Sequence, residues 1–256
     1  MKRPSGEALL LVPLLAACAP IGVTAYAGYT QMALRGDIAL TTGSGTTGNG
    51  AAAPRQDFDS GFGLGDERGS PYLRAQVDFG VPVLTASGFW LRETGAGVLD
   101  DAFGGLAGAT PVLSDLDLTL GKISCSFDIE LGALKVSPGL AVDLFDLRFR
   151  VRDLSGNSEE IDELLALPML FVRTEGSFGG LGLIGEAGYL EIPNVSGNKA
   201  RFFDLEAMVD WPILPLGSVF GGYRFIDLGA NGDTNADSFE VDLQVRGWFI
   251  GGGLRF

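Results

Sequence analysis

The sequence predicts an all-β protein, and more narrowly a closed antiparallel transmembrane β-barrel, on three observations. First, apolar and polar residues alternate along most of the 256-residue chain, which is the period of a strand with two different faces. Second, the candidate strands are joined alternately by short turns and long polar loops. Third, a positive mean hydropathy of +0.25 accompanies a net charge of −14, which strands with one apolar and one polar face explain.

Ten segments carry the strand pattern. In 203–211, for example, the odd positions are apolar and the even ones polar apart from Met208. The predicted strands are 28–41, 71–79, 82–93, 114–131, 134–153, 165–176, 181–192, 201–211, 217–228 and 239–256. Short turns are expected at 80–81, 132–133, 177–180 and 212–216, and long loops at 42–70, 94–113, 154–164, 193–200 and 229–238. An even number of strands with both chain ends at the short-turn side is the plan of an outer-membrane barrel.

Two irregularities interrupt this pattern. The alternation changes phase at Gly121-Lys122 and again at Leu144-Phe145, either because of a β-bulge or because a strand passes beyond a boundary. The sequence leaves both explanations open. Only Ser158–Leu167, which is acidic and then leucine-rich, has the composition for a turn or two of helix.

The N-terminal segment predicts export through a signal peptide. Residues 1–3 (MKR) are basic, and the apolar run 8–17 that follows is too short to span a bilayer. Two processing sites stay open: cleavage before Cys18, which would then be lipidated, or cleavage after Ala27 in an A-x-A sequence. We therefore predict a signal peptide within 1–27 and a barrel over 28–256, located in the outer membrane of a Gram-negative cell envelope.

The composition excludes several kinds of function. The chain has no histidine, which removes an imidazole base or a His-bound metal, and no G-x-S-x-G motif. Its negative charge, without any Lys/Arg cluster, excludes nucleic acid as a partner. Since Cys18 and Cys125 are the only cysteines, no disulfide framework is expected, and Cys125 is interpreted as a small apolar residue. We predict no enzyme activity, no cofactor and no metal.

Acidic pairs leave an outer-membrane enzyme as an alternative. Paired carboxylates occur at Asp100-Asp101, at Asp115 and Asp117, and in the stretch 159–163, although such pairs usually form a solvated face. Asp233, Asn235 and Asp237 place oxygen ligands at alternate positions, as at the start of a calcium loop. Because the glycine and glutamate of that loop are missing, a polar hairpin is the preferred interpretation.

Projecting the polar positions inward gives a lumen lined by charges of both signs. A ten-stranded barrel is only slightly wider than one that its own side chains fill, so these charges should meet as a salt-bridged plug. A narrow charge-lined channel for small solutes is the alternative. The candidate lumen residues are Arg74, Asp78, Asp117, Lys122, Asp128, Glu130, Lys135, Asp143, Arg148, Arg150, Arg173, Glu175, Glu186, Asp204, Glu206, Arg224, Asp242 and Arg246.

Which face of the strands meets lipid is the remaining question. A soluble lipocalin-like lipoprotein would show the same alternation with its apolar face inward. Aromatic residues near the predicted strand ends favour the membrane, since girdles of aromatic residues mark both interfaces. The girdle candidates are Tyr72, Phe89, Trp90, Tyr189, Trp211, Tyr223 and Trp248. A barrel of this kind, with a structural or surface-interaction role, would contact outer-membrane lipids and is expected to be a monomer.

The C-terminal strand is the most specific signal. It ends in Phe256, with Leu254 on the same face, and looks like the terminal strand that barrel-assembly machinery recognises. From about residue 57 to 256 the chain resembles an uncharacterised family of bacterial outer-membrane β-barrel proteins. The resemblance implies the barrel fold and the location, and it brings no catalytic or ligand residue. It rests on the order and spacing of 66–67, 71–74, 80–83, 114–118, 167–170, 222–224, 247–249 and Phe256.

Overall fold

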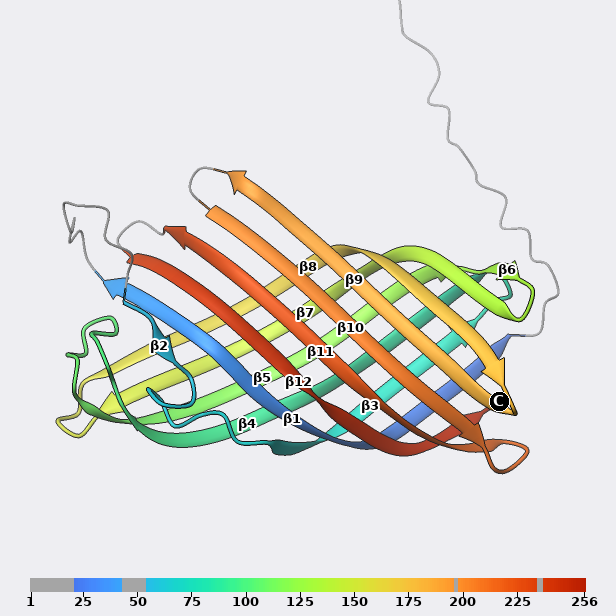
Figure 1. Ribbon diagram of the computed structural model, residues 1–256, viewed down its shortest axis with the longest axis horizontal. Coiled ribbons are helices and arrows are strands. Elements are labelled where there is room, and N and C mark those ends of the chain that lie inside the picture. The colour runs from blue at the N-terminus through green and yellow to red at the C-terminus, as the bar shows by residue number, and fades with distance from the viewer. Residues whose placement is uncertain (1–20, 43–53, 196–197, 234–236) are drawn as a thin grey trace, which may run out of the picture.

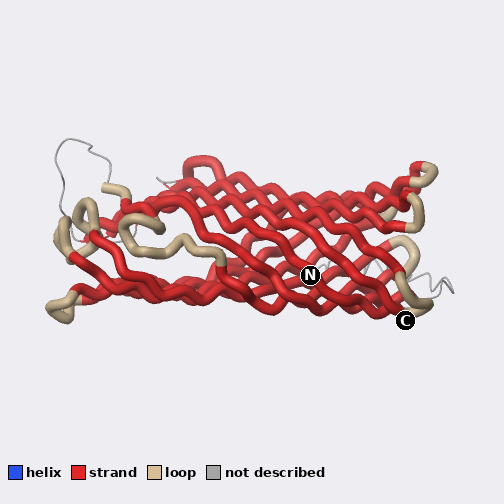
Figure 2. The backbone as a smooth tube through the Cα atoms, turned by 60° about the horizontal axis from the view of Figure 1, so that its bottom comes forward, coloured by secondary structure: helices blue, strands red, loops and turns tan. Residues whose placement is uncertain are grey.

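The computed structural model describes residues 21–42, 54–195, 198–233 and 237–256. In this part of the chain 12 strands form one sheet, and most loops lie at its two ends, although one also runs along the wall (Figure 2). No helix in the described ranges has the length and apolar character needed to cross a bilayer. The all-β class is therefore confirmed.

Ten of the strands form a closed antiparallel ring (Figure 1). Two short strands stand outside it: β2 (Gln56–Asp57) pairs with β1, and β6 (Ile129–Leu131) pairs with β7. The ring closes where β12 pairs with β1, from Thr24 opposite Arg255 to Thr42 opposite Asp237. Its strands in chain order are β1 (Gly22–Thr42), β3 (Arg68–Asp78), β4 (Pro82–Val98), β5 (Pro111–Phe127), β7 (Leu134–Asp153), β8 (Ser158–Phe178), β9 (Leu181–Val195), β10 (Asn198–Pro212), β11 (Gly217–Asp233) and β12 (Asp237–Arg255).

The two phase changes of the sequence are not β-bulges. β5 and β7 pair without a register shift from Val112 opposite Asp153 to Ser126 opposite Gly139. Along β5 every even-numbered residue from 112 to 126 is buried, so the same set of positions faces inward over the whole strand. What changes at Gly121 is the chemistry of the two faces. Below this level, toward the short-turn end of the barrel, the outer face is apolar. Above it, toward the long-loop end, the outer face is charged.

The apolar part of the outer face forms a belt around the ring. On β7 it spans residues 134–144, where Leu140 (64% exposed) and Leu144 (39% exposed) point outward. This length matches the about 9–11 residues with which a tilted strand crosses a bilayer. Trp90, Tyr189, Trp211, Tyr223 and Trp248 are exposed on the same face, as a girdle requires, and their position at the membrane interface stays a prediction.

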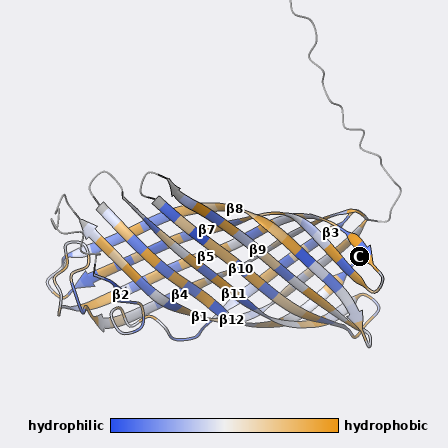
Figure 3. Cartoon of the chain, turned by 45° about the horizontal axis from the view of Figure 1, so that its top comes forward, coloured by the Kyte–Doolittle hydropathy of each residue, from blue (hydrophilic) through white to orange (hydrophobic). Residues whose placement is uncertain are grey.

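Tyr72 and Phe89 were wrongly predicted as girdle residues. Their side chains are 0% and 1% exposed and lie inside the barrel, because both occupy the inward phase of their strands. Apolar and polar residues alternate along the strands in Figure 3. An aromatic residue near a strand end can therefore be assigned to the girdle only when it is known that its side chain points outward.

Above the belt the strands continue into water as a crown, defined here as the part of the wall that carries charges outward. Outward ion pairs join Arg150 to Glu160 (2.8 Å) and Arg152 to Asp115 (3.1 Å). Much of the predicted loops 94–113 and 154–164 is consequently strand, and Ser158–Leu167 is part of β8 and not a helix. The prediction failed because charges on the outer face were taken as a sign of loops.

The first strand begins earlier than expected. β1 starts at Gly22, and Val23 exchanges backbone hydrogen bonds with Phe256 (3.1 and 2.8 Å) at the end where the ring closes. Ala25 pairs with Leu254 on one side and with Ala75 on the other. The predicted barrel boundary at residue 28 is therefore too late, since 22–27 belong to the wall. Cys18 lies outside the described residues.

This placement leads to a prediction about processing. Cleavage after Ala27 would strip the ends of β12 and β3 of their partner, and unpaired backbone groups in hydrocarbon cost several kcal/mol each. We expect the mature chain to retain 22–27, which leaves the site before Cys18. The intact mass of protein extracted from membranes checks this, and a mass matching a chain that starts at Gly28 would contradict it.

Candidate functional site

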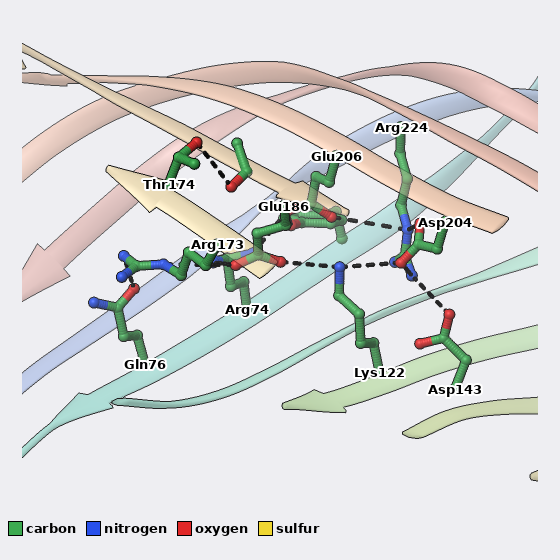
Figure 4. A network of polar contacts seen from close by, with 12 residues as sticks. Arg74, Gln76, Lys122, Asp143, Arg173, Thr174, Glu186, Asp204, Glu206 and Arg224 are labelled. Carbon is green, nitrogen blue, oxygen red and sulfur yellow. Dashed lines mark hydrogen bonds and ion pairs between the residues drawn. The ribbon is translucent and has the colours of Figure 1, made fainter. Parts of the chain in front are cut away.

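The interior of the belt holds a network of buried charges from seven strands (Figure 4). No member of the network is more than 2% exposed, although each has a long or charged side chain. The inward phase of consecutive strands brings them to one level of the lumen. The network comprises Arg74 (β3), Lys122 (β5), Asp143 (β7), Arg173 (β8), Glu186 (β9), Asp204 and Glu206 (β10) and Arg224 (β11).

Cations and carboxylates alternate through the network. Arg74 donates to Glu186 and, through its other terminal nitrogen, to Glu206 at 2.7 Å. Lys122 Nζ lies 2.9 Å from Glu186 Oε2 and 3.1 Å from Asp204 Oδ2. Each of these cations therefore bridges two carboxylates on the neighbouring strands β9 and β10, and so links its own strand, β3 or β5, to strands that are not its neighbours in the sheet.

Arg224 completes the network on its other side. Its guanidinium donates two hydrogen bonds to Asp204, at 3.0 and 3.1 Å, in the bidentate geometry that makes Arg–carboxylate pairs strong. The Tyr72 hydroxyl donates to Glu206 at 3.0 Å. Arg173 donates to Gln76 at 3.0 Å and to Glu175 at 2.5 Å.

The eight buried charges balance. Four are cationic and four are carboxylates, so the lumen of the belt contains no uncompensated unit charge from this set. Burial of paired charges contributes little net stability, but removing one partner leaves a charge without compensation and is strongly destabilising. The members of the network consequently depend on one another for charge compensation.

The crown has a different filling, which sequence reasoning missed. Its interior is an apolar core to which two loops contribute: Phe58, Phe62 and Leu64 from the first, and Phe103 and Leu106 from the second. The Phe62 ring lies 5.1 Å from that of Phe103 and 4.9 Å from that of Phe149 on β7. Packed aromatic side chains from the wall and the two loops therefore fill this part of the interior.

Polar contacts hold both loops in place. The Gln56 amide accepts from the Asp100 backbone N–H (2.9 Å) and donates to the Asp101 carbonyl (3.0 Å). The buried Glu93 carboxylate accepts from the backbone N–H groups of Gly65 and Asp66, both at 3.1 Å. The first loop lies directly on β4, since a Cβ at Gly95 would meet the carbonyl oxygen of Gly63 at 2.3 Å.

The structure confirms part of the predicted lumen set. Besides the network, Glu175 lies inside, and Asp128 binds Lys135 (3.3 Å) and Ser137 (2.6 Å) near the short-turn end. Asp78 caps the turn to β4 by accepting from Gly80 N–H. The structure places Arg74, Lys122, Asp143, Arg173, Glu186, Asp204, Glu206 and Arg224 buried in the lumen, and Glu175, whose side chain is 37% exposed, in the same inward phase beside Arg173.

The remaining lumen predictions are wrong. Glu130 is exposed on β6, and five others lie on the outer wall of the crown, where the polar face of each strand has become the outer one. Some of them form pairs there, such as Arg92 with Asp117 at 3.0 Å. The five misplaced outward residues are Asp117, Arg148, Arg150, Asp242 and Arg246.

One buried group escaped the prediction although its signal was present. Asp210 is 1% exposed, accepts from the Tyr26 hydroxyl (3.4 Å) and binds Arg255 near the short-turn end. It follows Asp204 and Glu206 in the same even phase of β10, so alternation alone identifies it.

The minor candidates add no site. Among the described residues no group of three potential ligands is placed to hold a metal ion. Asn235 lies outside the described residues, and Asp233 and Asp237 end and begin the strands that flank it. Cys125 is a free, half-buried thiol on the outer face between Ile123 and Phe127, in agreement with an apolar role.

Comparisons with known proteins address the fold. No family model matches the chain, and no curated protein sequence matches it. The structure is similar to that of the outer membrane protease OmpT from Escherichia coli, with a TM-score of 0.57 and 8% identity over 92% of this chain and 96% of that one. Ail, the attachment invasion locus protein of Yersinia pestis, gives 0.37 at 12% identity over 92% and 99% of the two chains.

The toluene transporter TodX of Pseudomonas putida gives a TM-score of 0.35 at 8% identity, covering 93% of this chain and 91% of that one. At such identities a likeness concerns the fold alone. Together with the closed ring of strands, it shows that this chain has the fold of the bacterial outer-membrane β-barrel proteins.

The network predicts that losing a buried ion pair lowers the free energy of unfolding much more than losing an exposed one. Lys122→Met removes the cation between Glu186 and Asp204, and we expect it to lower the free energy of unfolding by about 3–5 kcal/mol. The control Arg148→Met removes a pair with Asp162 whose side chains are 63% and 60% exposed, with an expected change below about 1 kcal/mol. Urea unfolding in lipid vesicles measures both, and equal losses would refute the plug.

Proposed function

We propose that the protein is an integral outer-membrane barrel that is closed to solutes and acts at the cell surface through its crown. The observation that carries this proposal is the filling of the interior. The charge network occupies the belt, and packed side chains from the wall and two loops occupy the crown. The hollows lined by Arg92 and Asp117, by Ala25 and Ile123, and by Gly185 and Ala207 all lie on the outer wall.

The orientation of the two faces supports the membrane over a soluble lipocalin-like protein. Large apolar residues such as Leu140, Leu170 (72% exposed) and Ile250 (52% exposed) point outward around the belt, while charges fill its inside. A contiguous exposed apolar surface of this size is unstable in water. In hydrocarbon the same surface is the required one, and a closed ring leaves no strand edge unpaired.

A structural or surface-interaction role also fits the chain better than catalysis. Asp115 and Asp117 point outward and are each bound to an arginine, and Glu159 accepts the backbone N–H of Gly105. These contacts explain the acidic pairs as parts of the wall and of the loop docking. The chain has no histidine to complement them as a base.

In the crown, a group of ion pairs lies where β1 and β12 close the ring. Arg55, just before β2, donates to Asp37 (2.7 Å), to Asp242 (2.8 Å) and to Glu240, and so ties both strands together. Hydrogen bonds to Glu240 and Asp242 raise the pKa of the Arg55 guanidinium above its ordinary value, so Arg55 stays charged. A crown held together by such contacts is suited to presenting a defined surface outside the cell.

The closed interior predicts the absence of ion conduction. Purified protein refolded into planar bilayers should give no stable conductance steps, because the network and the aromatic core leave no continuous aqueous path. Stable unitary steps would overturn the closed barrel and favour the narrow charge-lined channel. Heat-modifiable migration on gels, recorded on the same sample, controls for folding.

A further inference from the structure

Two strands of the crown leave their facing edges unpaired. β8 and β9 pair only from Leu170 opposite Tyr189 to Phe178 opposite Leu181. Beyond this point β8 continues to Ser158 with β7 as its partner, and β9 continues to Val195 beside β10 (Figure 1). Within the described ranges no strand pairs with the free edge of β8 over 158–169.

The parting of the two strands coincides with the outer limit of the belt. Tyr189 is an outward girdle residue, and the next outward residue on β9 is the exposed Glu191. Closure is compulsory in hydrocarbon, where an unpaired edge is costly, but not in water. Each free edge also contains a proline, Pro168 on β8 and Pro193 on β9, and proline is confined to such edges because it has no N–H to donate.

The free edge of β8 is strongly acidic. Glu159, Glu160, Asp162 and Glu163 lie within 158–169, which contains no lysine or arginine. β7 compensates two of them, through Arg150 with Glu160 and Arg148 with Asp162 (3.6 Å). Glu163 is exposed and has no cation within 4.0 Å among the described residues.

Apolar side chains accompany these carboxylates. Leu164 is 72% exposed, Leu165 is 38% exposed, and Ile192 on the opposite edge is 41% exposed. Both faces of β8 are therefore open at this level, in contrast to Leu167, which is 8% exposed where the wall is complete below. An added strand would find backbone partners, carboxylates and apolar contacts along one edge.

We propose that the free edge of β8 is a strand-acceptor site for an extended cationic segment of another polypeptide. Strand addition obtains affinity from main-chain hydrogen bonds and specificity from alternate side chains. Here the alternate side chains would be Lys or Arg opposite the carboxylates, with apolar residues beside Leu164 and Leu165. The inference rests on the proposed surface role and names the chemistry of the partner.

Charge argues against two other occupants of the free edge of β8, a segment of this chain and a second copy of it. The segment 43–53 of this chain contains no charged residue, so it would leave the acidic edge uncompensated. A second copy pairing edge to edge would place like charges opposite each other, which is destabilising. In the experiment below, either occupant would block the edge, and the labelled peptide would then fail to bind.

The test titrates the full refolded chain in detergent micelles with a fluorescein-labelled 12-residue peptide of alternating Lys and Val, followed by fluorescence anisotropy. We expect saturable binding. The same peptide with prolines in place of alternate valines keeps its charge but loses N–H donors, and it should not bind. Glu163→Lys should weaken binding about tenfold, because a like charge then faces the peptide.

Glu67→Lys is the matched control. Glu67 is an exposed glutamate just before β3, a strand that pairs with β1 and β4 and not with β8, and its replacement should change binding less than about twofold. Equal binding of the proline peptide, or equal losses for the two variants, would reduce the effect to general electrostatics and overturn the proposal. No binding by a folded barrel that conducts no ions would also overturn it, while leaving the closed barrel intact.

Discussion

Backbone hydrogen bonding in hydrocarbon is the constraint on which the rest of this structure depends. Within the belt every strand has two partners, including β1, whose first residues pair with β12 and β3 and whose Val23 is bonded to Phe256. Above the belt water satisfies free backbone groups, and there β8 and β9 part. Closure, the early start of β1 and the position of the free edges are thus consequences of one requirement.

The same boundary explains why the barrel has two kinds of interior. Inside the belt, the inward positions carry charges that neutralise one another across the lumen, as Lys122 does for Glu186 and Asp204, beside a small buried cluster that includes Tyr72 and Phe249. In the crown the outer face meets water, so the alternate positions can hold an ordinary apolar core around Phe62 and Phe149. The crown is built like a soluble β-barrel that continues a membrane one, and in our proposal the two fillings together close the path through the molecule.

Alternation in the sequence was sufficient to predict ten strands and most of the charge network, because Arg74, Arg173, Asp204, Glu206 and Arg224 all lie in strands at the level of the belt. It failed at Arg148, Arg150, Asp242 and Arg246, because period two separates two faces without stating which one is outside. The change from Leu144 to Asp146 at outward positions of β7 marks the level at which the outer face turns from apolar to charged. Contacts across the lumen, the docking of the two loops and the early end of the β8–β9 ladder depend on distant segments, and no local pattern predicts them.

The central claim is that the outer face changes from lipid contact to water contact at one level while the inward phase is kept. Spin labels placed singly at the outward positions 140, 142, 144, 146, 148 and 150 of β7, in protein reconstituted into vesicles, measure this directly through their accessibility to oxygen and to a polar nickel complex. The account predicts lipid-like accessibility at 140–144 and aqueous accessibility at 148–150, with the transition near Asp146. Aqueous accessibility along the whole series, or alternation of environment within it, would contradict the account.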